Sequence, residues 1–372
     1  MTQNIARRLL NLLAKNRPLT WRQWRNLLAS ATDEDRRYAK DLAGEITRSV
    51  FGKLVFYRGI IEFTNHCANN CLYCGIRKGN TGLVRYRLSE RQILEACADG
   101  YALGVRTFVL QGGEDQWFTD ARLEPIIEEL RQHFPDAAIT LSLGERSRES
   151  YQRLFAAGAN RYLLRHETAD PKHYRMLHAP KQSFWRRMNC LYMLREMGYQ
   201  TGCGMMVGTP WQNMDSLAED MYFIQAFRPQ MIGIGPFLPH HATPFHNRPA
   251  GNAELTLFLL SLCRIMNPRV LLPATTALRT LLPDGLTQGI AAGCNVVMPH
   301  LTAPTAGYEL YDGKPAVHDL NGELQTIREE LAAAGYALSS QRGDYMQEAQ
   351  PKRHRKLHDG IQTVFIKTRA QA

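Results

Sequence analysis

Short apolar runs alternate with amphipathic stretches of helical length from residue 54 onward, and this alternation constrains the fold more than any other feature. The predicted strands cover residues 54–63, 107–110, 138–142, 161–164, 201–207, 231–234, 270–272 and 295–298. The predicted helices between them begin at Ser89 and then cover 123–133, 149–157, 183–197, 214–227, 253–266 and 286–292. Such alternation is typical of parallel βαβ units. About eight units predict an α/β fold of the (β/α)8 barrel type, with an open doubly wound sheet as the alternative.

Additional helices flank the predicted barrel at both ends of the chain. Residues 4–50 are predicted to form helices, with Thr20 and Thr32 as N-caps. Within the barrel, Ser89 and Gln92 have the spacing of a capping box. A last helix over 322–334 precedes a basic tail. We therefore divide the chain into an N-terminal helical preface that packs on the barrel (1–50), the barrel (51–320), and a short C-terminal extension with a helix and a basic tail (321–372).

One loop after the first predicted strand carries three cysteines at short spacing. Cys67, Cys71 and Cys74 form a CxxxCxxC pattern, and Tyr73 precedes the last of them. Three thiolates are one short of a tetrahedral zinc site, whereas on a four-iron cube they would leave one iron open to a ligand. An aromatic ring at position 73 could shield such a cluster or stack on a bound base. The alternatives are buried structural thiols, or a zinc site completed by His66.

Polar residues and glycines gather where the predicted strands end, which in a barrel is where loops build the active site. Gln111, Gly112, Gly113 and Glu114 follow the second strand. Two glycines would let the backbone approach a ligand closely, and the carboxylate of Glu114 could meet an ammonium group. A glycine-rich turn with a solvated acid is the alternative.

The next strands end in groups suited to bind small charged molecules. The hydroxyl of Thr140 would face the lumen of a barrel or satisfy a core hydrogen bond. Arg165 could bind an anion and Glu167 an ammonium or a ribose hydroxyl, with a structural ion pair as the alternative. One of the two arginines at 186 and 187 could reach a carboxylate.

The last strands add two further groups. Thr275 and Thr276 could hold an anionic or metal-bound small molecule through neutral hydrogen bonds. The adjacent pair His240 and His241 is interpreted as surface residues.

The cysteine pattern with its preceding aromatic resembles the signature of the radical S-adenosylmethionine (SAM) superfamily. From Arg58 to Tyr311 the sequence resembles one branch of it, the HydE-type maturases of iron–iron hydrogenase, which are related to biotin synthase and methylornithine synthase. The segments that carry this resemblance are IEFTNHCANNCLYCG, VLQGGED, TLSLGE, YLLRHETAD, MVGTP, IGIGPFLPH, LPATTA and NVVMPH.

This resemblance implies a monomeric barrel with one 4Fe–4S cluster at its top, SAM on the open iron and a long internal cavity. It implies cluster ligation by Cys67, Cys71 and Cys74. It implies cofactor contacts from Tyr73, Gln111, Gly112, Gly113, Glu114, Glu167, Arg187 and Met231. It implies substrate-facing positions at Thr140, Arg165, Thr275, Thr276 and Tyr308. Many members carry a further cysteine trio for an accessory cluster, but Cys294 is the last cysteine here, so no second cluster is expected.

The activity implied by the resemblance is radical assembly of the hydrogenase di-iron subcluster from a small iron- and sulfur-containing precursor. The implied partners are a scaffold maturase, a carbonyl- and cyanide-producing maturase, and ferredoxin or flavodoxin as electron donor. A radical enzyme with an amino-acid substrate, of the methylornithine synthase or biotin synthase type, is the alternative. An iron–sulfur carrier without catalysis is a further one.

Charge is concentrated at the two ends of the chain. Residues 1–50 hold ten Lys/Arg and five Asp/Glu, and residues 351–372 hold six and one, which accounts for the net charge of +10. A solvated surface is favoured over a nucleic-acid contact, because no recognition motif accompanies these ends. No apolar run reaches the ~18 residues of a membrane span, and the N-terminus does not resemble a secretory signal. With most of the eight cysteines scattered, the sequence predicts a cytoplasmic protein without membrane contact.

Overall fold

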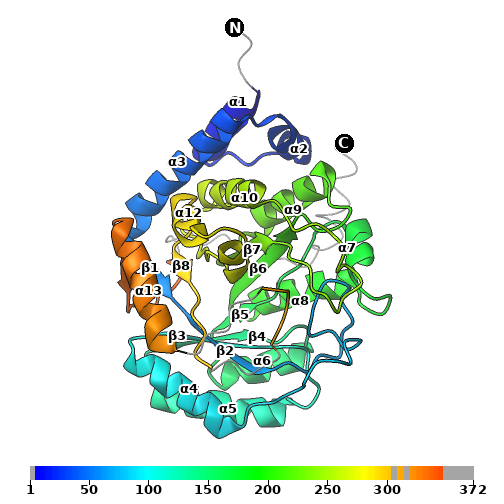
Figure 1. Ribbon diagram of the computed structural model, residues 1–372, viewed down its shortest axis with the longest axis vertical. Helices are drawn as coiled ribbons and strands as arrows, with labels where there is room; N and C mark the ends of the chain where they lie inside the picture. Colours follow the sequence, from blue (N-terminus) through cyan, green and yellow to red (C-terminus); the bar gives the residue numbers. More distant parts are fainter. Residues whose placement is uncertain (1–4, 303–307, 314–318, 347–372) are drawn as a thin grey trace.

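Six consecutive parallel strands form the main sheet of the computed structural model, which describes residues 5–302, 308–313 and 319–346 (Figure 1). Each strand is hydrogen-bonded to the next one in the chain. They are β2 (Gly59–Thr64), β3 (Thr107–Gly112), β4 (Ala138–Ser142), β5 (Arg161–Leu163), β6 (Gln200–Val207) and β7 (Met231–Pro236). Their apolar side chains are buried on both faces, as parallel strands covered by helices require.

Short parallel bridges carry the pairing from β7 back to β2. Met231 pairs with Leu271, Pro273 pairs with Val296, and His300 pairs with Ile60. The N–H of Ile60 donates to the Pro299 carbonyl over 2.9 Å, and the N–H of Leu301 donates to the Ile60 carbonyl over 2.8 Å. These bonds connect the last segment of the ring to β2. The described residues therefore follow the ring order of the predicted (β/α)8 barrel rather than that of an open sheet.

Helices surround the strands on the outside (Figure 1). They are α4 (Glu90–Ala102), α5 (Asp120–His133), α6 (Arg148–Ala156), α8 (Phe184–Glu196), α9 (Met214–Phe227), α10 (Ala253–Met266) and α12 (Gly285–Ala291). The predicted capping box forms at Ser89, whose hydroxyl accepts the backbone N–H of Gln92. Two short helices were not predicted, α7 (Pro171–Leu177) and α11 (Thr276–Leu281), and both follow strand ends. None of the described helices is long and apolar enough to cross a membrane.

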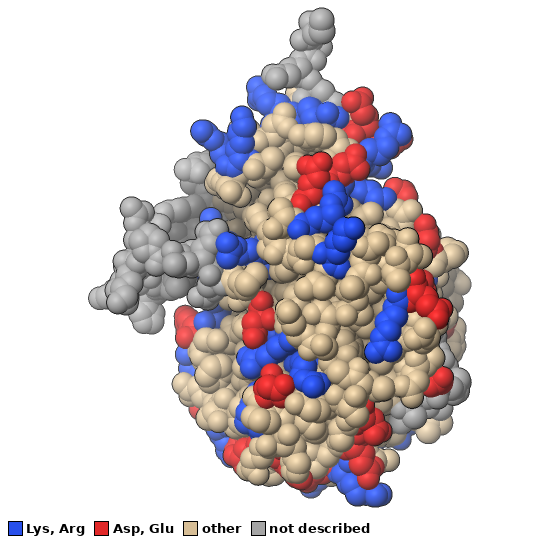
Figure 2. All heavy atoms as spheres, turned by 90° about the vertical axis from the view of Figure 1, so that its left-hand side faces the viewer, with Lys and Arg blue, Asp and Glu red and all other residues tan. Residues whose placement is uncertain are grey.

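The N-terminal helices pack on the barrel. They are α1 (Ile5–Ala14), α2 (Trp21–Ser30) and α3 (Asp33–Phe51), and Thr20 and Thr32 cap the last two, as predicted. α2 contacts α9 and α3 contacts α10. The indole of buried Trp24 donates to Gln225 Oε1 over 3.2 Å. Figure 2 shows basic and acidic side chains interspersed on the face that includes α3. The predicted basic tail at 351–372 lies outside the described residues.

The C-terminal extension closes the N-terminal end of the barrel. The predicted first strand is interrupted at Arg58, so that a separate strand β1 (Leu54–Tyr57) pairs with β8 (Val296–Val297) and with β9 (Ala337–Ser339). α13 (Leu320–Ala333) leads into β9. Fully buried Arg161 donates to the carbonyls of Arg342 and Gly343 and pairs with Asp344 at 2.7 Å. The cysteine loop lies at the other end, after β2.

Candidate active site

The cysteine loop is held in shape by one arginine. Arg85 donates to four backbone carbonyls, those of Asn65, Ile76, Arg77 and Asn80, over 2.5–3.1 Å. The amide of Asn80 in turn donates to the carbonyl of Gly75 over 2.8 Å. The loop therefore keeps its fold through protein hydrogen bonds.

The three thiols of this loop lie close enough to act on one another. Burial raises the pKa of Cys71 to about 11, and the neighbouring Cys67 thiolate adds to the rise. Burial and the thiolates of Cys71 and Cys67 raise the pKa of Cys74 well above its usual value. Repulsion of this kind requires that the three sulfurs lie near one another. Three neighbouring thiolates are a donor set that fits a metal centre of positive charge, such as an iron–sulfur cluster.

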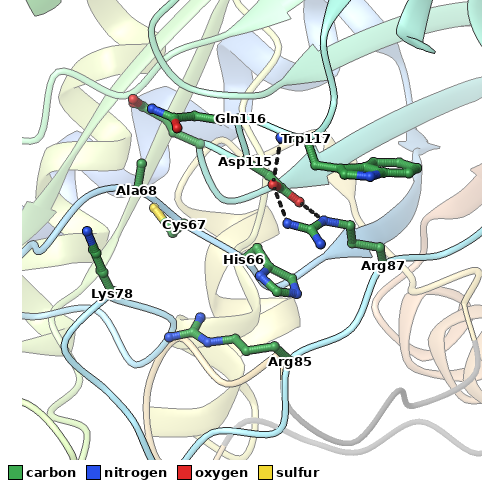
Figure 3. Close-up of a pocket in the computed structure, with 10 residues that line it drawn as sticks. His66, Cys67, Ala68, Lys78, Arg85, Arg87, Asp115, Gln116 and Trp117 are labelled. Carbon is green, nitrogen blue, oxygen red and sulfur yellow. Dashed lines mark hydrogen bonds and ion pairs between the residues drawn. The ribbon is translucent and has the colours of Figure 1, made fainter.

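A pocket with a volume of about 330 Å³ opens beside Cys67 (Figure 3). The imidazole of His66 points toward Arg85 and away from the Cys67 sulfur. Arg87 pairs with Asp115 at 2.7 Å and lies 5.4 Å from the ring centre of Trp117. Because the imidazole points away from the Cys67 sulfur, its position does not support the alternative of a zinc site completed by His66.

The two glycines at the end of β3 allow β2 and the cysteine loop to approach closely. A Cβ atom on Gly113 would lie 2.2 Å from the His66 carbonyl oxygen and 2.6 Å from Cys67 Cβ. A Cβ atom on Gly112 would lie 2.7 Å from the methyl carbon of Thr64. In the structure, the cysteine loop comes close to Gly113 and the end of β2 comes close to Gly112, whereas the sequence argument had expected a ligand there.

Two carboxylates and a buried arginine meet next to the cysteines. Arg187 Nε lies 2.8 Å from Glu145, and its Nη2 lies 3.4 Å from Glu114. Burial alone would lower the pKa of Arg187, but the two carboxylates hold it well above its usual value. Burial raises the pKa of Glu145. Glu145 was not among the predicted site residues, although its place two residues after the TLSL run of β4 was a usable signal.

Arg165 and Glu167 form the ion pair that was considered as an alternative, at 3.1 Å. Glu167 has a φ of 65°, a conformation that non-glycine residues rarely adopt and that often marks a functional site. Its backbone N–H donates to Gly204 over 3.0 Å, which fixes the carboxylate at the end of β5. The Nε of Arg165 is buried and has no hydrogen-bond partner within the described residues.

Two buried tyrosines lie near the cysteines, Tyr73 within the loop and Tyr308 from the segment 308–313. Tyr73 is 3.1 Å from His178 Nε2, and burial raises its pKa well above the usual value. Tyr308 is buried, hydrogen-bonds Gln111, and has a pKa raised by burial and by the nearby charges of Glu62 and Cys74. The structure thus brings Tyr308 and Gln111 together beside the cysteines.

The segment 308–313 lies over the cysteine loop. The N–H of Gly75 donates to the carbonyl of Leu310 over 3.0 Å. His241 is exposed as expected, and its ring pairs with Asp312 at 2.7 Å. The surface interpretation was wrong for His240, which is 1% exposed, because its ring packs against Gly75.

The predicted hydroxyls occupy different positions along the barrel. Thr140 is buried on β4, and its Oγ1 has no hydrogen-bond partner within the described residues. Thr275 caps α11 by accepting the N–H of Leu278, and its Oγ1 would lie 2.8 Å from a Cβ atom on Gly235 of β7. Thr276 is the first residue of α11 and is half-buried.

The expectation for Met231 does not fit its position. Met231 is the first residue of β7, at the end of the strand opposite to the cysteine loop. Its sulfur accepts a hydrogen bond of 3.0 Å from Arg58, a buried residue whose Nε and Nη2 have no hydrogen-bond partner within the described residues. Both residues line a small interior pocket together with Thr140. Met231 therefore belongs to the floor of the barrel, and Arg58 is a buried cation that the sequence argument missed.

Comparisons with known proteins agree with this arrangement. Residues 61–224 match the family described as the radical SAM superfamily. The chain is 45% identical to the FeFe-hydrogenase maturase subunit HydE of Thermotoga maritima over 75% of this chain and 80% of that protein. It is 26% identical to the 3-methylornithine synthase of Methanosarcina acetivorans over 73% of this chain and 77% of that protein.

Solved structures with the same fold include a methylornithine synthase and a hydrogenase maturase. A crystal structure of methylornithine synthase superposes with a TM-score of 0.78 at 24% identity, covering 89% of this chain and 97% of that one. The maturase HydG from Carboxydothermus hydrogenoformans superposes with a TM-score of 0.74 at 22% identity, covering 90% of this chain and 79% of that one.

Proposed function

Because this chain belongs to the HydE family of the radical SAM superfamily, we propose that it makes a precursor of the di-iron subcluster of iron–iron hydrogenase. The observation that carries the proposal is the meeting of three thiols with the Glu114–Arg187–Glu145 cluster at one end of the barrel. The three thiols would hold one 4Fe–4S cluster. When bound, the cluster and SAM supply a 5′-deoxyadenosyl radical by reductive cleavage of the sulfonium.

The residues around the thiols suit the amino-acid part of SAM. That group carries one ammonium and one carboxylate. Glu114 offers a carboxylate for the first, and Arg187 offers a guanidinium for the second. Glu145 keeps Arg187 charged and oriented from its other side. Gln111, Tyr73 and Glu167 complete our proposed cofactor contacts, since all three lie near the cysteines.

The interior of the barrel suits a compact anionic substrate. Arg58 is a buried cation on the floor of the barrel, and Arg165 is a partly exposed cation whose Nε is buried. Both have nitrogens that lack a hydrogen-bond partner within the described residues. Thr140 adds a hydroxyl that finds no partner in the part of the chain that the structure describes, and Thr275, Thr276 and Tyr308 add neutral hydrogen-bonding groups. A buried unpaired donor is costly, so a bound anion would satisfy these groups. We propose a small iron- and sulfur-containing complex in this position, delivered by one maturase and passed on to another.

The experiment that tests this function is product analysis under anaerobic conditions. Reconstituted protein with SAM, a reductant and an iron–sulfur precursor should release 5′-deoxyadenosine in amounts that depend on that precursor. Lysine or dethiobiotin as the productive substrate would favour a methylornithine or biotin synthase type instead. Release of no 5′-deoxyadenosine with any substrate would leave an iron–sulfur carrier. Cys71→Ala should abolish the product, whereas Cys97→Ala, in a buried cysteine of α4, should retain it.

A further inference from the structure

The end of α7 and the connection from α7 to α8 contact three successive residues of the cysteine loop, Cys71, Leu72 and Tyr73. The N–H of Leu72 donates to the carbonyl of Leu177 over 2.9 Å. The hydroxyl of Tyr73 meets His178 Nε2 at 3.1 Å. The amide nitrogen of Gln182 lies 3.1 Å from the sulfur of Cys71. We propose that Gln182 is a positioning residue that raises the reduction potential of the cluster by donating a hydrogen bond to Cys71, an inference that rests on the proposed function.

The orientation of the Gln182 amide follows from its other contacts. Its Oε1 accepts the backbone N–H of Ala179 over 3.2 Å, and its own backbone N–H donates to the Ala179 carbonyl over 2.9 Å. A flipped amide would turn NH2 toward an N–H group and oxygen toward the sulfur, and both contacts would be repulsive. The donor half of the amide therefore faces Cys71.

Hydrogen bonds on both sides fix where this donor lies. His178 Nδ1 is 2.9 Å from the carbonyl of Tyr174, which can only accept, so Nδ1 carries the proton and Nε2 accepts from Tyr73. Burial lowers the pKa of His178 to about 3, which keeps the ring neutral. His178 also stacks on Tyr174 with ring centres 3.8 Å apart. These contacts therefore hold the connection in one position against the cysteine loop, with the Gln182 amide next to the Cys71 sulfur.

A donor at a ligating sulfur favours the cluster state with more negative charge. Reduction adds one electron whose charge spreads over the sulfurs, so the hydrogen bond becomes stronger and the potential rises. Cys67 and Cys74 receive backbone N–H groups from Asn69, Glu114 and Ile76, which substitution cannot remove. The Gln182 contact is a side-chain contact and can be removed.

The test is an EPR-monitored redox titration of the reconstituted protein without SAM. Gln182→Met keeps the length of the side chain and loses the donor. We expect its reduction equilibrium to shift about tenfold toward the oxidised state, which is about 59 mV more negative for one electron. Gln182→Glu keeps an acceptor for Ala179 and also lacks the donor, so its potential should fall by at least as much. Lys181→Met, at the exposed neighbouring position, should match the wild type.

The outcomes separate this inference from the proposed function. Equal iron content in all variants with a lower potential in both Gln182 variants supports the hydrogen bond. Potentials within error of the wild type in both variants, with full iron content, overturn it while leaving the proposed function intact. Should Gln182→Met load iron poorly, an unchanged potential in Gln182→Glu still overturns the inference, because the lost donor and the added negative charge would both lower it. A wild-type protein that binds no iron at all would instead reject the proposed function.

Discussion

Arg187 shows at the scale of one residue how burial and charge define the site. It is a buried cation between Glu145 at 2.8 Å and Glu114 at 3.4 Å, whereas the preceding Arg186 has a side chain that is 66% exposed. A charged hydrogen bond contributes about 1.5–3 kcal/mol, which is about tenfold to a hundredfold in affinity. We predict that Arg187→Met weakens SAM binding by that factor and that Arg186→Met changes it less than about threefold. Equilibrium dialysis of the iron-loaded variants measures this, and equal affinities in the two variants would contradict the assignment.

His178 gives the protein a predictable sensitivity to acid. The unfolded chain takes up a proton near pH 6.5, whereas the buried ring has a pKa lowered to about 3. Its contribution to stability is therefore full above pH 6.5 and is lost as the pH falls toward 3, by about 1.4 kcal/mol per pH unit. We predict that the free energy of unfolding falls less between pH 7.5 and 5.5 in His178→Gln than in the wild type.

Urea titrations of the protein without iron at the two pH values measure this difference. His241→Gln is the control, since this ring is exposed and its pKa is raised by the hydrogen bond and charge of Asp312. Parallel losses in wild type and His178→Gln would show that His178 is not the group responsible.

At the scale of elements, the extension after β9 is expected to stabilise the barrel. Asp344 pairs with fully buried Arg161 at 2.7 Å, and its own side chain is 40% exposed. Removing one partner of a buried pair costs about 3–5 kcal/mol, and the partial exposure favours the lower end of that range. We predict that Asp344→Asn lowers the free energy of unfolding by about 3 kcal/mol in urea titrations.

The matched control is Asp136→Asn, which removes a carboxylate that pairs with Arg106 and is 56% exposed. Exposed pairs contribute about 0–1 kcal/mol, so this variant should be close to the wild type. Similar losses in both variants would mean that the extension does not stabilise the barrel through this pair.

Elements with strong local signals could be predicted from the sequence, and those that depend on distant partners could not. The capping residues Thr20, Thr32 and Ser89 locate helix starts because capping is a contact within four residues. β9 is short, and its pairing with β1 joins segments that lie far apart in the chain, so no local sequence pattern predicts it.

In the site, the cysteine spacing indicated the cluster loop. The Cys71 contact of Gln182 and the position of Met231 depend on how the loops and strands pack.

At the scale of the whole molecule, the barrel has one end that the C-terminal extension closes and one end that carries the cysteine loop. Arg161 and the extension after β9 close the N-terminal end of the strands, and the cysteine loop occupies the other. Because Cys294 is the last cysteine of the chain, we predict that reconstitution gives about four irons per chain, as for a single cube. Iron analysis together with acid-labile sulfide measures this, and a value near eight would indicate a second cluster.

The claim on which the account depends is that Cys67, Cys71 and Cys74 hold a cluster with one iron open to SAM. The most direct measurement is the EPR spectrum of the reduced, reconstituted protein recorded with and without SAM. We predict a 4Fe–4S signal that changes when SAM is added and that is lost in Cys71→Ala but retained in Cys97→Ala. Protein that contains zinc in place of iron, or a cluster signal that SAM leaves unchanged, would contradict the account.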